Sequence, residues 1–305
     1  MQSVKKYLSL VKFSHTIFAM PFALIGFVLG VCSSFRGGNT IYFLNNFLGF
    51  GIILSKLFLV IICMVTARSA AMAFNRYLDR SFDAKNPRTS IREIPAGIIS
   101  PNSALRFVIF NGILFITATF FINPICFYLS PIALFVILFY SYTKRFTPFC
   151  HLVLGLGLSL APIGAYLAVT GRFDILPILF SFAVLFWVSG FDVIYALQDV
   201  EFDQSQKLFS IPGVLGKSKA LHVSEWLHVF SAACVFTAGF YGSFHFIYWL
   251  GVCMFSVMLI YQHAIVKPND LSKVNIAFMT ANGIASVVFG GLVILDLLLN
   301  FNQVV

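Results

Sequence analysis

Two short windows hold six of the chain's 11 acidic residues, and the spacing of those residues predicts a site that binds metal ions. In the first window, 75–83, Asn75, Asp79 and Asp83 follow one another at intervals of four. Residues four apart on an α-helix lie on one face, about 6 Å apart along the axis. The first window therefore predicts a helix that carries a stripe of oxygen ligands.

The second window, 192–203, repeats this arrangement. Tyr195, Asp199 and Asp203 are again four residues apart, and Asp192 precedes Asp199 by seven. If the window is helical, these side chains share a face and Asp192 lies deepest. At an offset of 120 residues (199 − 79), four identities pair Asp79 with Asp199, Asp83 with Asp203, Ser90 with Ser210 and Ile91 with Ile211. We interpret them as a weak internal repeat that places both stripes on one side of the protein.

Clustered oxygen ligands indicate a particular cation. Mg²⁺ prefers octahedral oxygen coordination and is typically held by carboxylates together with substrate phosphates. Basic side chains flank the same windows: Arg76, Arg80, Lys85, Arg88, Arg92, Lys144, Arg145 and Lys207. Carboxylates mixed with cations favour a metal-bridged anion over a plain cation site. One stripe alone could be a solvated helix face, but two in register favour a site where Mg²⁺ bridges a diphosphate.

The elements that position these windows are membrane spans. Of the 305 residues, 59% are hydrophobic and only 10% are charged, whereas soluble domains carry roughly 25% charged residues. This composition excludes a soluble enzyme, a disordered chain and a typical nucleic-acid binder. Apolar runs of helical length also exclude a β-barrel. We expect an all-α, polytopic integral membrane protein, a helix bundle with cap loops and a single domain over residues 1–305.

A bilayer core requires about 20 apolar residues per helix. Nine stretches meet that requirement: 15–34, 57–78, 104–121, 125–142, 150–169, 175–197, 220–240, 244–263 and 275–298. The apolar segment Ile41–Ser55 contains Asn45, Asn46 and two glycines, so we interpret it as an interfacial segment before the second span. The first stretch is long and lacks a good cleavage site, which disfavours a cleaved signal peptide.

The basic residues predict the orientation. When the loops are numbered alternately, Arg36, Lys56 and Arg172 fall on one side and the other 17 of the 20 Lys and Arg (20 − 3) on the opposite side. Positive residues concentrate in the cytoplasm. We therefore predict a bacterial-type inner membrane protein whose N-terminus and active site lie on the cytoplasmic side, with the tail 300–305 outside. The scattered cysteines and histidines disfavour any other metal or redox site.

The two windows resemble the signatures of the UbiA-type intramembrane prenyltransferases. The first signature is N-x-x-x-D-x-x-x-D, carried by 75–83, and the second is Y-x-x-Q-D-x-x-x-D, carried by 195–203. The resemblance extends to 86–97 and to 140–145, so it covers nearly the whole chain. The family is all-helical with nine spans, which agrees with the count above.

The resemblance implies that the protein transfers an isoprenoid chain from an allylic diphosphate to an acceptor, usually an aromatic ring, with Mg²⁺ as cofactor. It implies one metal ion held by Asn75, Asp79 and Asp83, and another held by Asp199 and Asp203. It also makes three basic residues candidates for diphosphate contacts: Arg88, Lys144 and Lys207.

The chemistry of such a transfer suggests four further residues. Loss of diphosphate leaves an allylic cation that water would quench, and the rings of Tyr195 and Tyr140 are candidates to stabilise it. Asp192 is the candidate to accept a proton from the acceptor hydroxyl. Arg68 is the candidate to pair with an acceptor carboxylate or the diphosphate. Aromatic packing or a snorkelling arginine is the structural alternative for these residues.

The acceptor has two candidates. Within the family, the chain is most similar to the 4-hydroxybenzoate polyprenyltransferase branch, which acts in ubiquinone biosynthesis and often begins with an R-x-D-x-P-type segment. Here that segment is KFSHTIFAMPF, Lys12–Phe22, which is similar to prenyltransferases of the futalosine route to menaquinone, whose acceptor is a dihydroxynaphthoate-type acid. We expect a polyprenyl diphosphate, an aromatic acid and membrane lipid as partners, with no nucleic acid and no obligate protein partner. A transporter is the rival class, disfavoured because the acids lie at the cytoplasmic edge.

Overall fold

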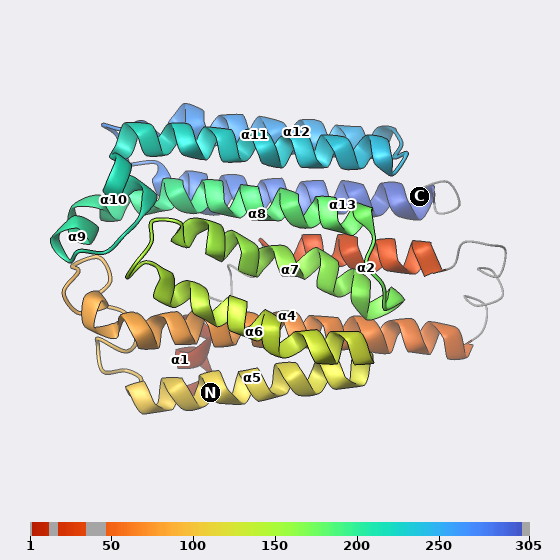
Figure 1. Cartoon of the computed structure of the whole chain (residues 1–305), viewed down its shortest axis with the longest axis horizontal. Coiled ribbons are helices and arrows are strands. Elements are labelled where there is room, and N and C mark those ends of the chain that lie inside the picture. The colour runs from red at the N-terminus through yellow and green to blue at the C-terminus, as the bar shows by residue number, and fades with distance from the viewer. Residues whose placement is uncertain (1, 12–17, 35–46, 301–305) are drawn as a thin grey trace.

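The computed structural model describes residues 2–11, 18–34 and 47–300, and in it the chain folds as a bundle whose long helices run along one common direction (Figure 1). The helices are α1 (Gln2–Leu10), α2 (Met20–Ser34), α4 (Phe47–Asp83), α5 (Pro101–Ile122), α6 (Pro124–Thr143), α7 (Cys150–Thr170), α8 (Ile175–Ala196), η2 (Leu197–Asp199), α9 (Val200–Ser205), α10 (Ile211–Leu215), α11 (Lys217–Tyr241), α12 (Phe246–Ile265), η3 (Ile276–Ala281) and α13 (Asn282–Leu299). The predicted all-α class is confirmed.

Eight helical segments of the described chain are long and apolar enough to cross a membrane. They contain α4, α5, α6, α7, α8, α11, α12 and α13, and α2 is a shorter apolar helix. Together these nine helices correspond to the nine predicted stretches. The protein is therefore an integral membrane protein.

The structure corrects the interpretation of the segment before the second span. α4 has 37 residues, about 55 Å at a rise of about 1.5 Å per residue, whereas a bilayer core is about 30 Å thick. From Phe47 onward, the expected interfacial segment Ile41–Ser55 is part of this helix, because a lipid-facing backbone is satisfied only by helical hydrogen bonds. Residues 41–46 lie outside the described chain, as do 12–17, Arg36 and the tail 301–305.

The helix that carries the second window is held between two neighbours by close contacts. A Cβ added to Gly155 of α7 would lie 2.3 Å from Ser189 Oγ and 2.4 Å from the carbonyl oxygen of Leu185, both on α8. A Cβ added to Gly190 of α8 would lie 2.4 Å from His228 Cδ2 on α11. Small residues allow such close approach of membrane helices. They fix the position of α8 relative to α7 and α11.

We expect Gly155→Val to destabilise the protein by about 1–3 kcal/mol, because the added side chain must push α7 away from the α8 backbone. Thermal unfolding in detergent measures this as a lower Tm. Gly291→Ala is the matched control, since no atom of the described residues lies within 4 Å of a Cβ added at that position of α13. An unchanged Tm for Gly155→Val would show that α7 and α8 do not make this contact.

An aromatic core joins the first described span to the last ones. The Trp187 ring on α8 lies 5.3 Å from Phe22 of α2 and 5.8 Å from Phe255 of α12, measured between centroids. Trp187 Nε1 donates to Asn282 Oδ1 at 2.9 Å, and Gln262 Nε2 donates to the same oxygen at 2.9 Å. The bundle therefore has a buried polar contact at its centre whose donors are satisfied.

The polar connections gather at one end of the bundle. In Figure 1 the connection 84–100 and the segment with α9 and α10 lie together at the left, where α4 and α8 end. This end carries both acidic windows. It corresponds to the cap loops expected from the sequence.

Candidate functional site

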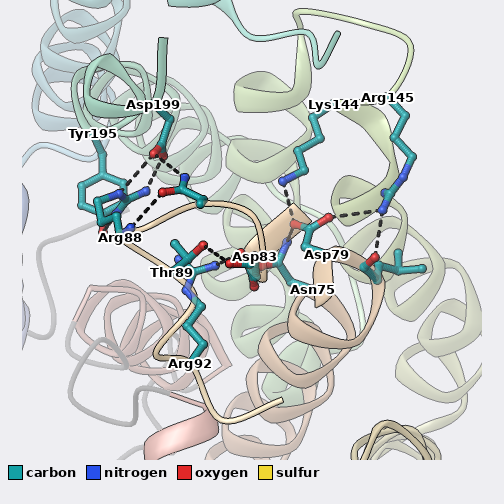
Figure 2. Close-up of polar contacts among 12 residues, drawn as sticks. Asn75, Asp79, Asp83, Arg88, Thr89, Arg92, Lys144, Arg145, Tyr195 and Asp199 are labelled. Atoms are coloured by element: carbon teal, nitrogen blue, oxygen red, sulfur yellow. Dashed lines mark hydrogen bonds and ion pairs between the residues drawn. The ribbon is translucent and has the colours of Figure 1, made fainter. Parts of the chain in front are cut away.

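The two acidic windows meet at this capped end, with basic side chains between them (Figure 2). Asn75, Asp79 and Asp83 lie on the last turns of α4, as predicted, and the connection 84–100 follows directly. Asp79 is only 2% exposed and Asp83 5% exposed. A buried carboxylate is costly unless cations or hydrogen bonds compensate its charge. The partners of these acids therefore define the site.

Asp79 has three partners. Lys144 Nζ lies 2.7 Å from Asp79 Oδ2, and Arg145 Nη2 lies 3.2 Å from Oδ1. Asn75 Nδ2 donates to Oδ2 at 3.1 Å. Both cations belong to the connection that follows α6, so Asp79 ties this connection to the end of α4.

Within the described part of the chain, Asp83 is bound through one of its two carboxylate oxygens. Arg92 Nη1 lies 2.7 Å from Asp83 Oδ1. Asp83 Oδ2 is buried and has no hydrogen-bond partner among the described residues. An unpaired buried carboxylate oxygen costs free energy, and it is the kind of atom that ligates a divalent cation.

Asp199 connects the second window to the connection 84–100. The Arg88 guanidinium binds both carboxylate oxygens of Asp199, with Nε 3.1 Å from Oδ1 and Nη2 paired with Oδ2. Asn86 Nδ2 also donates to Oδ1, at 3.4 Å. Burial opposes the charge of Arg88, but Asp199 and the Tyr195 hydroxyl outweigh burial, so the pKa of Arg88 is raised. The Arg88–Asp199 pair joins two segments that are 111 residues apart in the sequence.

The second window is not the continuous α-helix that the spacing predicts. α8 ends at Ala196, a 3₁₀ turn follows in η2, and α9 begins at Val200. Asp199 pairs with Arg88, whereas Asp203 accepts a hydrogen bond from Ser210 Oγ at 2.8 Å. The 3₁₀ turn therefore interrupts the predicted α-helix between Tyr195 and Asp203, and Asp199 and Asp203 bind different partners.

Tyr195 is engaged with Arg88. Arg88 Nη1 donates to the Tyr195 hydroxyl at 3.0 Å, and the guanidinium lies 5.3 Å from the ring centroid. The Phe278 ring lies 4.3 Å from the same ring. Lys207, by contrast, is exposed in the turn between α9 and α10, where its φ is 54°.

A cavity of about 380 Å³ lies between α4, α6 and α7, and its lining on α4 ends at Met72, three residues before Asn75. Arg68 and Tyr140 line it, and its other lining residues are almost all apolar. Along α4 the lining extends from Val60 to Met72, a separation of 12 positions (72 − 60), or roughly 18 Å at the helical rise. The cavity therefore fits a long hydrocarbon chain with one polar end.

Asp192 has a partner that sequence spacing did not reveal. His151 Nδ1 lies 2.7 Å from Asp192 Oδ2, and these residues belong to α7 and α8. The sequence offers no signal for this pair, since 41 residues separate its members. Among the described residues, no three His, Cys, Asp or Glu side chains lie close enough to hold a metal ion by themselves.

Comparisons with known proteins agree with this geometry. The sequence model described as the UbiA prenyltransferase family matches residues 42–284. A relative from Tolumonas auensis named 4-hydroxybenzoate octaprenyltransferase is 26% identical over 227 residues, which cover 74% of this chain and 79% of the relative.

Solved structures share the fold. A UbiA homologue from Aeropyrum pernix K1, solved in its apo form, is 27% identical with a TM-score of 0.79, and the match covers 93% of this chain and 98% of the homologue. A UbiA homologue from Archaeoglobus fulgidus bound to DMAPP and Mg²⁺ is 19% identical with a TM-score of 0.67, and the match covers 95% and 98% of the two chains.

Proposed function

We propose, since the chain belongs to the UbiA prenyltransferase family, that this membrane prenyltransferase transfers a polyprenyl chain from an allylic diphosphate to a ring carbon of a hydroxylated aromatic acid. One observation carries the proposal. Two acidic windows, each paired with basic side chains (Figure 2), lie near an apolar cavity whose lining on α4 ends at Met72, three residues before Asn75. This arrangement suits a substrate that is polyanionic at one end and hydrocarbon at the other.

The acids fit a divalent metal ion. Asn75, Asp79, Asp83, Asp199 and Asp203 are the residues that would hold Mg²⁺, and the buried, unpaired Asp83 Oδ2 supports this assignment. The Archaeoglobus fulgidus homologue, which binds DMAPP and Mg²⁺, supports it as well. When bound, Mg²⁺ supplies positive charge that compensates the departing diphosphate.

The basic residues between the windows bind the diphosphate. Arg88 and Lys144 now pair with Asp199 and Asp79, which places one cation beside each window. Arg88 presents a planar fork that matches phosphate geometry. Tyr195 holds that fork through its hydroxyl and ring, so we assign it to positioning Arg88. Lys207, exposed in the cap, is the third candidate for the diphosphate.

The apolar cavity takes the prenyl chain. Its lining excludes water from the allylic cation that forms when the bond between the prenyl carbon and the diphosphate oxygen breaks. Tyr140 lines this space and supplies an aromatic ring to the cation. Arg68 lines the same space and pairs with the carboxylate of the acceptor.

The acceptor step needs a base. We assign this role to Asp192, which takes the hydroxyl proton as the ring carbon forms its bond to the prenyl carbon. When the ring regains aromaticity, the proton on that carbon leaves to water and Asp192 returns its proton to the oxygen. The net products are the prenylated acid, diphosphate and one proton.

We propose 4-hydroxybenzoate as the acceptor and a dihydroxynaphthoate as the alternative. The name of the Tolumonas auensis relative supports the first. We place the enzyme in a bacterial-type inner membrane with its site on the cytoplasmic side, because 17 of its 20 basic residues (20 − 3) fall on that side. The chain functions as one domain.

An assay in membranes tests the acceptor and the metal together. A polyprenyl diphosphate is supplied with either acid, with Mg²⁺ or with EDTA, and products are detected by mass. We expect prenylated product from one acid, its loss in EDTA and its return when Mg²⁺ is restored. Failure with both acids would reject the proposal that the acceptor is a hydroxylated aromatic acid of quinone biosynthesis. Full turnover in EDTA would reject the assignment of Mg²⁺ as cofactor.

A further inference from the structure

Asp192 is paired with a buried histidine, His151. The His151 side chain is 4% exposed and the Asp192 side chain 24% exposed, and they are joined by the 2.7 Å contact between Nδ1 and Oδ2. The imidazole is therefore enclosed by protein, whereas the carboxylate keeps an open side. A histidine held this way is suited to fix the direction of the carboxylate.

The second ring nitrogen of His151 determines where the proton lies. The backbone N–H of Ile211, the first residue of α10, donates to His151 Nε2 at 3.4 Å. A ring nitrogen that accepts a hydrogen bond carries no proton, so the proton of the neutral imidazole lies on Nδ1. Nδ1–H is then the donor to Asp192 Oδ2.

The backbone around His151 is held equally well. Ser189 Oγ, on α8, donates to the carbonyl oxygen of His151 at 3.1 Å. Four residues further along α7, Gly155 makes the close contact with α8 described above. α7, α8 and α10 therefore fix the ring from three directions, and a ring so constrained loses little entropy when it binds Asp192.

We propose that His151 is a positioning residue for acceptor activation, an inference that rests on the proposed function. Its Nδ1–H holds Oδ2 of Asp192, and the other carboxylate oxygen accepts the hydroxyl proton of the aromatic acid. No proton leaves His151: the charge-assisted hydrogen bond to the carboxylate becomes a neutral one when Asp192 is protonated. The hydrogen bond from Ile211 connects His151 to α10 in the cap. The position of Asp192, the proposed base, therefore depends on α10 as well as on α7.

Steady-state kinetics of the full-length enzyme in detergent test this role, with a polyprenyl diphosphate and 4-hydroxybenzoate as substrates. His151→Phe keeps the ring but removes both nitrogens, whereas His151→Asn restores a donor near the position of Nδ1. We expect His151→Phe to lower kcat on the order of 10- to 100-fold with KM for the diphosphate unchanged, and His151→Asn to recover most of that loss.

Two further measurements separate positioning from a structural role. With 3-fluoro-4-hydroxybenzoate, whose hydroxyl is more acidic, the loss in His151→Phe should shrink because less help from a base is needed. Added to Asp192→Asn, the His151→Phe change should cost nothing more, since both act on one step. His222→Phe, an exposed histidine of α11, is the matched control and should leave kcat unchanged.

The outcomes are distinct. Wild-type enzyme that yields no prenylated acid overturns the proposed function and this inference with it. If the wild type is active, three results each overturn the inference alone: His151→Phe with unchanged kcat, His151→Asn no better than His151→Phe, or a loss that stays constant with the more acidic acceptor. If His151→Phe does not fold, His151→Ala, which also removes both ring nitrogens, takes its place in all three comparisons.

Discussion

Replacing Asp79 by alanine is expected to lower prenyl transfer on the order of 1000-fold, while the protein remains inserted and folded. Asp79 is buried, and Lys144, Arg145 and Asn75 converge on it. Its removal takes away a proposed Mg²⁺ ligand and leaves two cations beside the diphosphate without their anchor. Those cations are 30% and 21% exposed in their side chains, so water can solvate them and the fold survives.

The measurement is kcat/KM for the diphosphate in detergent, over a range of Mg²⁺ concentrations, with folded protein quantified by thermal unfolding. Asp296→Ala is the matched control. That carboxylate is also fully buried, but it accepts backbone N–H bonds from His245 and Tyr248 at the start of α12. We expect the control to lower Tm and to keep the turnover of its folded fraction. Near-full turnover by Asp79→Ala would contradict the assigned role.

The helical part of this site could be predicted from sequence because it depends on local geometry. A spacing of four residues at the end of a long apolar run allows one arrangement, a stripe on one helix face, and α4 has it. The same logic placed both windows at one end of the bundle, since alternating spans determine which side each loop reaches.

The rest depends on contacts between distant segments. Spacing predicts a stripe over 192–203, but the pairing of Asp199 with Arg88 and of Asp203 with Ser210 favours a turn there. Nothing local to His151 indicates that it binds Asp192. Ion pairs between separate helices depend on how the helices pack, and single-sequence periodicity does not report packing.

Replacing Asp199 by alanine is expected to have an effect as large as that of Asp79→Ala, on the order of 1000-fold. Asp199 is the only carboxylate paired with Arg88 among the described residues. Without it, the second window loses a proposed metal ligand, and among the described residues the Arg88 side chain keeps only its contacts with Tyr195. Single-turnover and steady-state assays should both show the loss, because it affects the bond-breaking step rather than product release.

Arg88→Ala separates the two proposed roles of Asp199, which are to hold Arg88 and to ligate Mg²⁺. If Asp199 served only to hold Arg88, Asp199→Ala, Arg88→Ala and the double variant would be equally slow. If Asp199 also holds Mg²⁺, Asp199→Ala should be slower than Arg88→Ala and should need more Mg²⁺ for its residual turnover. Glu201→Ala is the matched control, because this exposed acid two residues away pairs, among the described side chains, only with Lys217. Equal rates and equal Mg²⁺ dependence for Asp199→Ala and Arg88→Ala would remove Asp199 from the metal site.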